Sequence, residues 1–251
     1  MIRQRSDTMF FFGNGIDRRT LYIILAICAV ISLATAGTGV WIQTLLALPA
    51  VVIAITFHEF AHAWTANKFG DYTPKSQGRL TLNPAAHVDP FGFVLLLFAG
   101  IGWGKPVQIN PNNFTSNKSR STCEALVSLA GPLMNFILAI LFTFIFFTIG
   151  KYGPNTEIIA TILLLIQEII IINIGLGIFN LIPLPPLDGE KIFRSILPYN
   201  AIQWLDTNAN ILYMVFMVLW ITGLLGRIVS PITTTIFAVL LKGVGMIFGV
   251  F

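Results

Sequence analysis

The sequence predicts an all-α polytopic membrane protein with about six transmembrane helices and a re-entrant or β-hairpin segment between the second and third helices. Charged residues make up only 10% of the 251 residues and hydrophobic residues 55%, whereas soluble globular domains carry roughly a quarter charged residues. The mean hydropathy is +0.81, and the apolar residues gather in runs long enough to cross a bilayer as helices. The formal net charge of +4 is small and scattered, so nothing indicates a nucleic-acid-binding surface.

The apolar runs define the elements in chain order. A polar, basic N-terminus of residues 1–20 precedes one membrane-embedded domain of residues 21–251. We expect six spans, at residues 21–38, 42–66, 123–150, 158–182, 211–226 and 228–250. The apolar run at residues 91–103 is too short to cross as a helix, and we expect it to form a re-entrant or interfacial hairpin.

Two stretches that flank this short run, residues 79–83 and 107–110, alternate apolar and polar residues and are each followed by proline. Alternation is typical of a half-buried strand, so the two stretches could pair at the membrane surface. The pair could be a structural hairpin alone, or its free edge could bind an extended peptide by strand addition.

The distribution of Lys and Arg predicts the orientation of the spans. With the N-terminus inside, twelve of the fifteen basic residues lie in inner loops, as the positive-inside rule requires. These twelve are Arg3, Arg5, Arg18, Arg19, Lys68, Lys75, Arg79, Lys105, Lys118, Arg120, Lys191 and Arg194. The second and fourth spans then both run from outside to inside, so their C-terminal ends lie on the same side of the membrane.

The end of the second span carries the motif His58-Glu59-Phe60-Ala61-His62. Residues four apart lie on one face of an α-helix, so His58 and His62 can chelate one zinc ion. Glu59 can then act as a general base on water that the metal activates. The alternative is three satisfied polar residues in a helix bundle, but each buried ionisable group costs about 2.5–3.5 kcal/mol in a membrane span.

Asp188 is the candidate for the third zinc ligand, because a catalytic zinc takes three protein ligands and leaves one position open. It follows a proline-rich break at residues 183–186 that cannot continue the helix. Gly189 allows a sharp bend, and such a segment can return the carboxylate to the histidines. Alternatively, Asp188 could be the N-cap of the helix that follows.

With the HExxH motif of His58–His62 and the Asp-Gly pair Asp188-Gly189, the chain resembles the site-2 proteases, the family of intramembrane zinc metalloproteases. The resemblance covers essentially the whole hydrophobic core and implies a catalytic core at about residues 42–210. It implies one zinc ion held by His58, His62 and Asp188, with Glu59 as the base. The longest polar connection is too short for a PDZ or CBS module, so the resemblance is to a minimal form.

The resemblance also implies that Asn180 polarises the scissile carbonyl or holds the substrate; alternatively it hydrogen-bonds a neighbouring helix. His87, Asn135 and Asn83 are candidate substrate-binding residues. His87 could also be a fourth ligand or a plug that gates the zinc, although a loop-stabilising role is favoured. Asn135 ends the stretch Gly131-Pro132-Leu133-Met134-Asn135, similar to a Gly-Pro…Asn motif of the family, and could serve helix packing alone.

The resulting hypothesis is a zinc-dependent endopeptidase that cleaves within or near the transmembrane segments of membrane proteins, in some cases after another protease has cut the substrate. We expect a multi-pass protein of a bacterial plasma membrane, with the N-terminus and the active-site opening cytoplasmic and the lipid bilayer as its surroundings. The alternatives are an inactive zinc-binding scaffold of the same fold and a zinc hydrolase that cuts peptides at the membrane surface.

Overall fold

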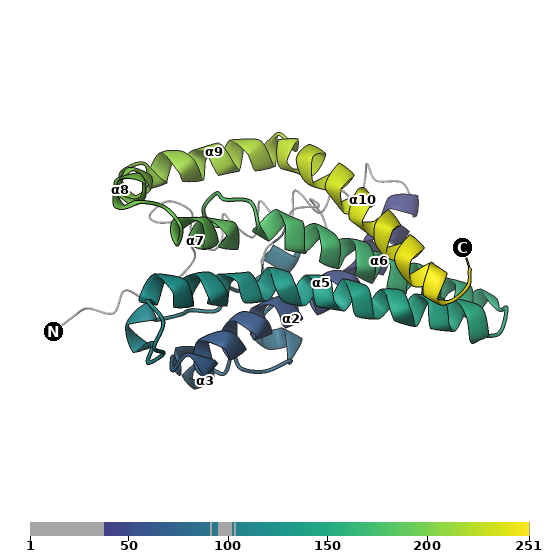
Figure 1. Cartoon of the computed structure of the whole chain (residues 1–251). Helices are drawn as coiled ribbons and strands as arrows, with labels where there is room; N and C mark the ends of the chain where they lie inside the picture. The colour runs from purple at the N-terminus through teal and green to yellow at the C-terminus, as the bar shows by residue number, and fades with distance from the viewer. Residues whose placement is uncertain (1–37, 91, 95–101, 103, 251) are drawn as a thin grey trace.

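The computed structural model describes residues 38–90, 92–94, 102 and 104–250. Four of the helices in this part of the chain are long and apolar enough to cross a membrane (Figure 1): α2 (Thr38–Lys68), α5 (Arg120–Tyr152), α6 (Glu157–Asn180) and α10 (Leu224–Ile247). The shorter elements are α3 (Thr73–Ser76), η1 (Pro84–Ala86), η2 (Pro111–Asn113), α7 (Asp188–Arg194), α8 (Tyr199–Thr207) and α9 (Ala209–Ile221). The chain is therefore an all-helical, multi-pass membrane protein across its described part.

Local sequence signals set the ends of the central helices. Ser119 caps α5 by accepting a 3.1 Å hydrogen bond from the Thr122 N–H, and Thr156 caps α6 through the Ile159 N–H at 3.4 Å. The helix α6 ends at Asn180, just before the prolines, because proline lacks the N–H that would continue a helix.

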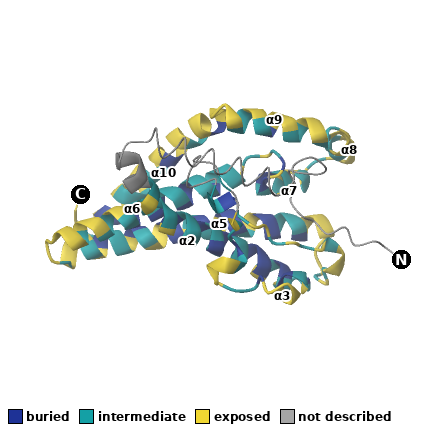
Figure 2. Ribbon diagram, turned by 180° about the vertical axis from the view of Figure 1, so that it is seen from behind, coloured by how far each residue is buried: buried dark blue, intermediate teal, exposed yellow. Residues whose placement is uncertain are grey.

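The centre of the molecule is the packing of α2, α5 and α6 against one another, with α10 against α6 and α5. An apolar cluster of Ala139, Ile166, Ile170 and Ile174 joins α5 and α6. In Figure 2, exposed residues cover much of α9 and α10, and many of these are large hydrophobic side chains such as Ile221, Ile228 and Val239. Apolar side chains on the outside are expected where lipid replaces water.

The expected spans at residues 42–66, 123–150, 158–182 and 228–250 correspond to α2, α5, α6 and α10. The expected span at 211–226 is not one helix, because α9 ends at Ile221 and α10 begins at Leu224, after Gly223 in the left-handed conformation (φ 71°). The helix α9 is preceded by α8, and the two are bent by 69° at the break between them. At 13 residues, α9 alone is about 20 Å long, which is short of the ~30 Å hydrocarbon core. The expected first span lies outside the described residues.

The expected strand pairing of residues 79–83 with 107–110 is wrong. Within the described residues, the pairing in this region is an isolated antiparallel bridge between Val88 and Gly104. Each stretch ends in a turn and does not continue as a strand. Asn83 and Asn110 each cap a 3-10 turn that begins at the following proline. The expected re-entrant segment lies mostly outside the described residues, but this bridge brings its two flanks together.

Candidate metal centre

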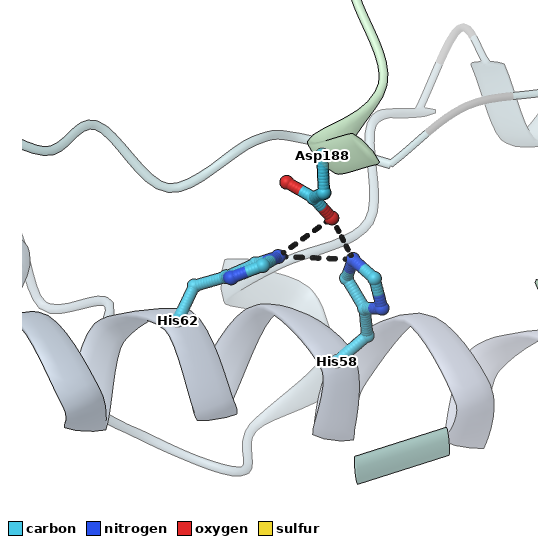
Figure 3. Close-up of side chains that lie close together, drawn as sticks. All are labelled: His58, His62 and Asp188. Atoms are coloured by element: carbon cyan, nitrogen blue, oxygen red, sulfur yellow. Dashed lines mark hydrogen bonds and ion pairs between the residues drawn. The ribbon is translucent and has the colours of Figure 1, made fainter. Parts of the chain in front are cut away.

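The helix α2 presents His58 and His62 one turn apart, on the face that packs against α5 (Figure 3). Both side chains are buried, and their rings meet edge to face with centroids 4.6 Å apart. Figure 3 shows Asp188 entering from above, at the first turn of α7. The parallel course of α2 and α6, expected from the charge distribution, brings these segments together at one end of the bundle.

Three candidate ligand atoms form a nearly equilateral triangle. The Nε2 atoms of His58 and His62 are 3.0 Å apart, and Asp188 Oδ2 lies 3.1 Å from each of them. A search of the described residues for three or more histidine, cysteine or carboxylate side chains close enough to hold one metal ion finds this group.

The opposite edge of each imidazole is engaged by the protein. His62 Nδ1 donates to the Val127 carbonyl oxygen at 2.7 Å, and His58 Nδ1 faces Asn135 Oδ1 at 2.7 Å. A carbonyl oxygen can only accept, so in the neutral rings Nδ1 carries the proton and Nε2 a lone pair. Two imidazole lone pairs and a carboxylate oxygen then converge on one point, which favours a cation there.

This donor set fits zinc. Zinc takes imidazole nitrogen and carboxylate oxygen at about 2.0–2.2 Å, so two ligands on a tetrahedral ion lie about 3.3 Å apart. The ligand atoms are 3.0 and 3.1 Å apart, so they need to move apart only slightly to hold a zinc ion. Three protein ligands would leave the fourth position open, as in catalytic zinc sites.

The segment after α6 explains how Asp188 reaches the histidines. Asp188 is the first residue of α7, and the N-cap position belongs to Leu187, so the carboxylate is directed at the imidazoles and does not cap the helix. A Cβ at position 189 would overlap the carbonyl oxygens of Leu181 and Ile182. Gly189 therefore permits a close approach of α7 to the end of α6.

Glu59 points to a different neighbour. Its Oε2 accepts a 2.8 Å hydrogen bond from the Val107 N–H, in a stretch without regular secondary structure at residues 105–110. A cavity of about 340 Å³ lies against this stretch, lined by Val107, Ile109, Pro111, Glu124, Val127, Ser128, Glu190, Lys191 and Arg194. Glu59, the metal-ligand candidates and the charged cavity therefore lie close together.

The remaining predicted site residues have local partners. Asn180 donates to the Leu176 carbonyl oxygen of its own helix at 3.1 Å. Asn83 is exposed and caps η1. His87 is fully buried, and its Nε2 donates to the Thr81 carbonyl oxygen at 2.8 Å, which favours the loop-stabilising interpretation.

Asn135 is fully buried beside His58. Substrate contacts by these residues stay predictions.

Three further contributors were not predicted. Gly131 faces both histidines, and a Cβ there would overlap His62 Nε2 and lie 2.7 Å from His58 Cε1. Its place in the Gly-Pro…Asn stretch was a usable signal. Val127 and Val107 contribute backbone groups, which no side-chain motif could reveal.

Two buried histidines and a half-buried carboxylate that converge inside a multi-pass helical membrane protein are typical of the class of membrane-embedded metalloproteins. The sequence model of "Peptidase family M50" matches residues 46–167 and 152–223. The chain therefore belongs to peptidase family M50, the site-2 protease family.

Individual relatives agree with this assignment. The chain is 40% identical to "Putative zinc metalloprotease YwhC" of Bacillus subtilis over 185 residues, which cover 72% of this chain and 82% of that protein. It is 31% identical to "Putative zinc metalloprotease MJ0611" of Methanocaldococcus jannaschii over 200 residues, 78% of this chain and 91% of that protein. No match to a solved structure was found.

Proposed function

We propose that this chain is a zinc-dependent intramembrane endopeptidase, with His58, His62 and Asp188 as the ligands of one zinc ion. The observation that carries the proposal is the convergence of His58 Nε2, His62 Nε2 and Asp188 Oδ2 within 3.1 Å of one another. Glu59 in the same turn of α2 adds the base that a protease requires.

When bound, zinc supplies Lewis-acid activation of water and of the scissile carbonyl. Glu59 accepts the proton of the attacking water and delivers it to the leaving amine. The Val107 N–H that binds Glu59 Oε2 holds the carboxylate toward residues 105–110 and leaves Oε1 for this proton transfer. Asn180 donates one amide hydrogen to Leu176, and its second N–H is a candidate donor to the developing oxyanion.

The cavity beside residues 105–110 is the proposed site of the unwound substrate. Val107, Ile109 and Pro111 are spaced two apart and all line it, as expected for one face of an extended segment. A helix hides its peptide bonds, so a substrate has to unwind before its carbonyl meets the metal.

A second, apolar cavity of about 180 Å³ lies between α2 and α6. Its lining includes Val52 and Ile55 of α2 and Ile172 and Leu176 of α6. Val52 and Ile55 precede Glu59 by seven and four residues, so they share its face of the helix. We assign this cavity to the apolar side chains of the substrate's transmembrane segment.

The proposed setting is a bacterial plasma membrane, with the N-terminus and the opening of the site in the cytoplasm. The charged lining of the larger cavity, with Lys191 and Arg194, supports an opening toward water on the side that the positive-inside rule makes cytoplasmic. The proposed partner is a transmembrane protein, in some cases already cut by another protease.

The alternative, an inactive zinc-binding scaffold, is not favoured, because a binding site alone has no need of Glu59 between the ligands. A zinc hydrolase acting at the membrane surface is disfavoured by the depth of His58. It lies ten residues before the end of α2 at Lys68, about 15 Å at the rise of an α-helix.

The test uses purified wild type and Glu59→Gln protein, each loaded with zinc and incubated with a panel of single-span substrates in liposomes. We expect cleavage within or beside the span by the wild type, mapped by mass spectrometry, and a loss of at least about 100-fold in Glu59→Gln. Equal cleavage by both proteins, or cleavage by neither while zinc is bound, would refute the proposal.

A further inference from the structure

A line of buried amides leads from the metal centre into α6. Asn135 and Asn173 are both fully buried, on α5 and α6 respectively. The Asn135 Nδ2 atom donates to Asn173 Oδ1 at 2.9 Å and to the Ala54 carbonyl oxygen at 3.1 Å. The Asn173 Nδ2 atom in turn donates to the Ile169 carbonyl oxygen at 2.8 Å.

The two carbonyl groups fix which way each amide points. A backbone carbonyl can only accept, so the Ile169 oxygen requires the NH₂ group of Asn173 on its side and leaves Asn173 Oδ1 facing Asn135. The Ala54 oxygen and Asn173 Oδ1 then both require the NH₂ group of Asn135. Asn135 Oδ1 is therefore the atom that faces His58 Nδ1, at 2.7 Å.

We propose that Asn173 and Asn135 form a relay that fixes the tautomer and the orientation of His58. With Oδ1 facing it, His58 Nδ1 has to carry the proton, and the lone pair of Nε2 is directed at the metal position. A reversed Asn135 amide would place an NH₂ group against His58 Nδ1 and favour the opposite tautomer, which cannot bind a metal through Nε2. Asn173 is thus a positioning residue that touches neither metal nor substrate.

The relay also joins three helices at the metal centre. His58 belongs to α2, Asn135 to α5 and Asn173 to α6, and these helices form the packed centre of the bundle. An amide that loses its hydrogen-bond partners in an apolar interior is strongly destabilising, so the hydrogen bonds of Asn135 and Asn173 resist reorientation of either amide. The inference rests on the proposed zinc site, but its test reads metal binding directly and needs no substrate.

The experiment compares full-length wild type with Asn173→Leu, Asn173→Asp and Thr143→Val in detergent. Asn173→Leu removes the acceptor that Asn135 requires. A protonated Asp at position 173 keeps both an acceptor and a donor. Thr143 is a fully buried residue of α5 that donates only within its own helix, to Ala139, so Thr143→Val is the matched control.

The readouts are the zinc dissociation constant, from competition with a chelator, and the absorption spectrum of bound Co²⁺. We expect zinc to bind about 10–100-fold more weakly to Asn173→Leu, with a changed Co²⁺ spectrum, while Asn173→Asp and Thr143→Val remain near the wild type. Wild-type affinity in Asn173→Leu, or equal weakening in all three variants, would overturn the relay alone. Absence of zinc binding by the wild type would overturn the proposed metal site as well.

Discussion

Gly131 of α5 lies directly against the metal-binding edge of His62, so that a Cβ at position 131 would overlap His62 Nε2. The same Cβ would come within 2.7 Å of His58 Cε1. The glycine therefore provides the space that the two imidazoles occupy.

This contact predicts that Gly131→Ala displaces the histidines and weakens zinc binding by at least about 10-fold, since metal sites tolerate only small errors in ligand position. Chelator competition on the purified variant measures the change. Gly150→Ala, in the same helix with open space around position 150, is the matched control and should bind zinc like the wild type. Full zinc affinity in Gly131→Ala would show that the site does not need this space.

Gly189→Ala should weaken zinc binding by displacing Asp188, the ligand that α7 contributes. The new Cβ would collide with the backbone carbonyls of Leu181 and Ile182, which cannot rotate away, so α7 and Asp188 must shift. We expect weaker zinc binding and a lower melting temperature in detergent. Gly243→Ala on α10, where nothing lies nearby, should change neither, and equal behaviour of the two variants would argue against the close approach.

Asp71 organises the loop that carries Val107. It is fully buried and accepts hydrogen bonds from Thr73 N, Thr73 Oγ1 and Asn113 Nδ2 on one oxygen, and from Asn110 N on the other. Burial alone would raise its pKa, but these hydrogen bonds outweigh burial and the pKa is lowered.

Asp71→Asn should therefore lower the free energy of unfolding by about 2 kcal/mol at neutral pH. Because the folded-state pKa is lowered, the stabilisation is complete above the unfolded value of about 3.9 and is lost as the pH falls through the folded value. The melting temperatures of wild type and Asp71→Asn should differ at pH 7 and converge below about pH 4. A constant difference across this range would contradict the role of the ionised carboxylate.

The sequence was sufficient for the parts of the fold that depend on composition and spacing. Apolar runs located α2, α5, α6 and α10, and the four-residue spacing put His58 and His62 on one face. The charge distribution predicted that α2 and α6 run in parallel, which brings Asp188 to the histidines.

Other features depend on which groups meet after folding. The Val127 carbonyl and the Val107 N–H are backbone groups, and their partners are set by the packing of α5 and by the loop at residues 105–110. The strand prediction failed because the caps formed by Asn83 and Asn110 outweigh the alternating pattern. The break between α9 and α10 falls inside the expected span at 211–226, because Gly223 takes a left-handed conformation (φ 71°) that a count of apolar residues does not detect.

The central claim is that His58, His62 and Asp188 hold one zinc ion, and zinc stoichiometry tests it most directly. Zinc per chain would be measured in purified wild type, Asp188→Ala and Asp206→Ala after dialysis against a weak chelator. Asp206 pairs with Arg194 at 2.8 Å near α7 and is 60% exposed, so its variant is the control. We predict one zinc ion per chain in the wild type and Asp206→Ala, and loss of the ion from Asp188→Ala. Absence of zinc from the wild type, or its full retention by Asp188→Ala, would contradict the claim.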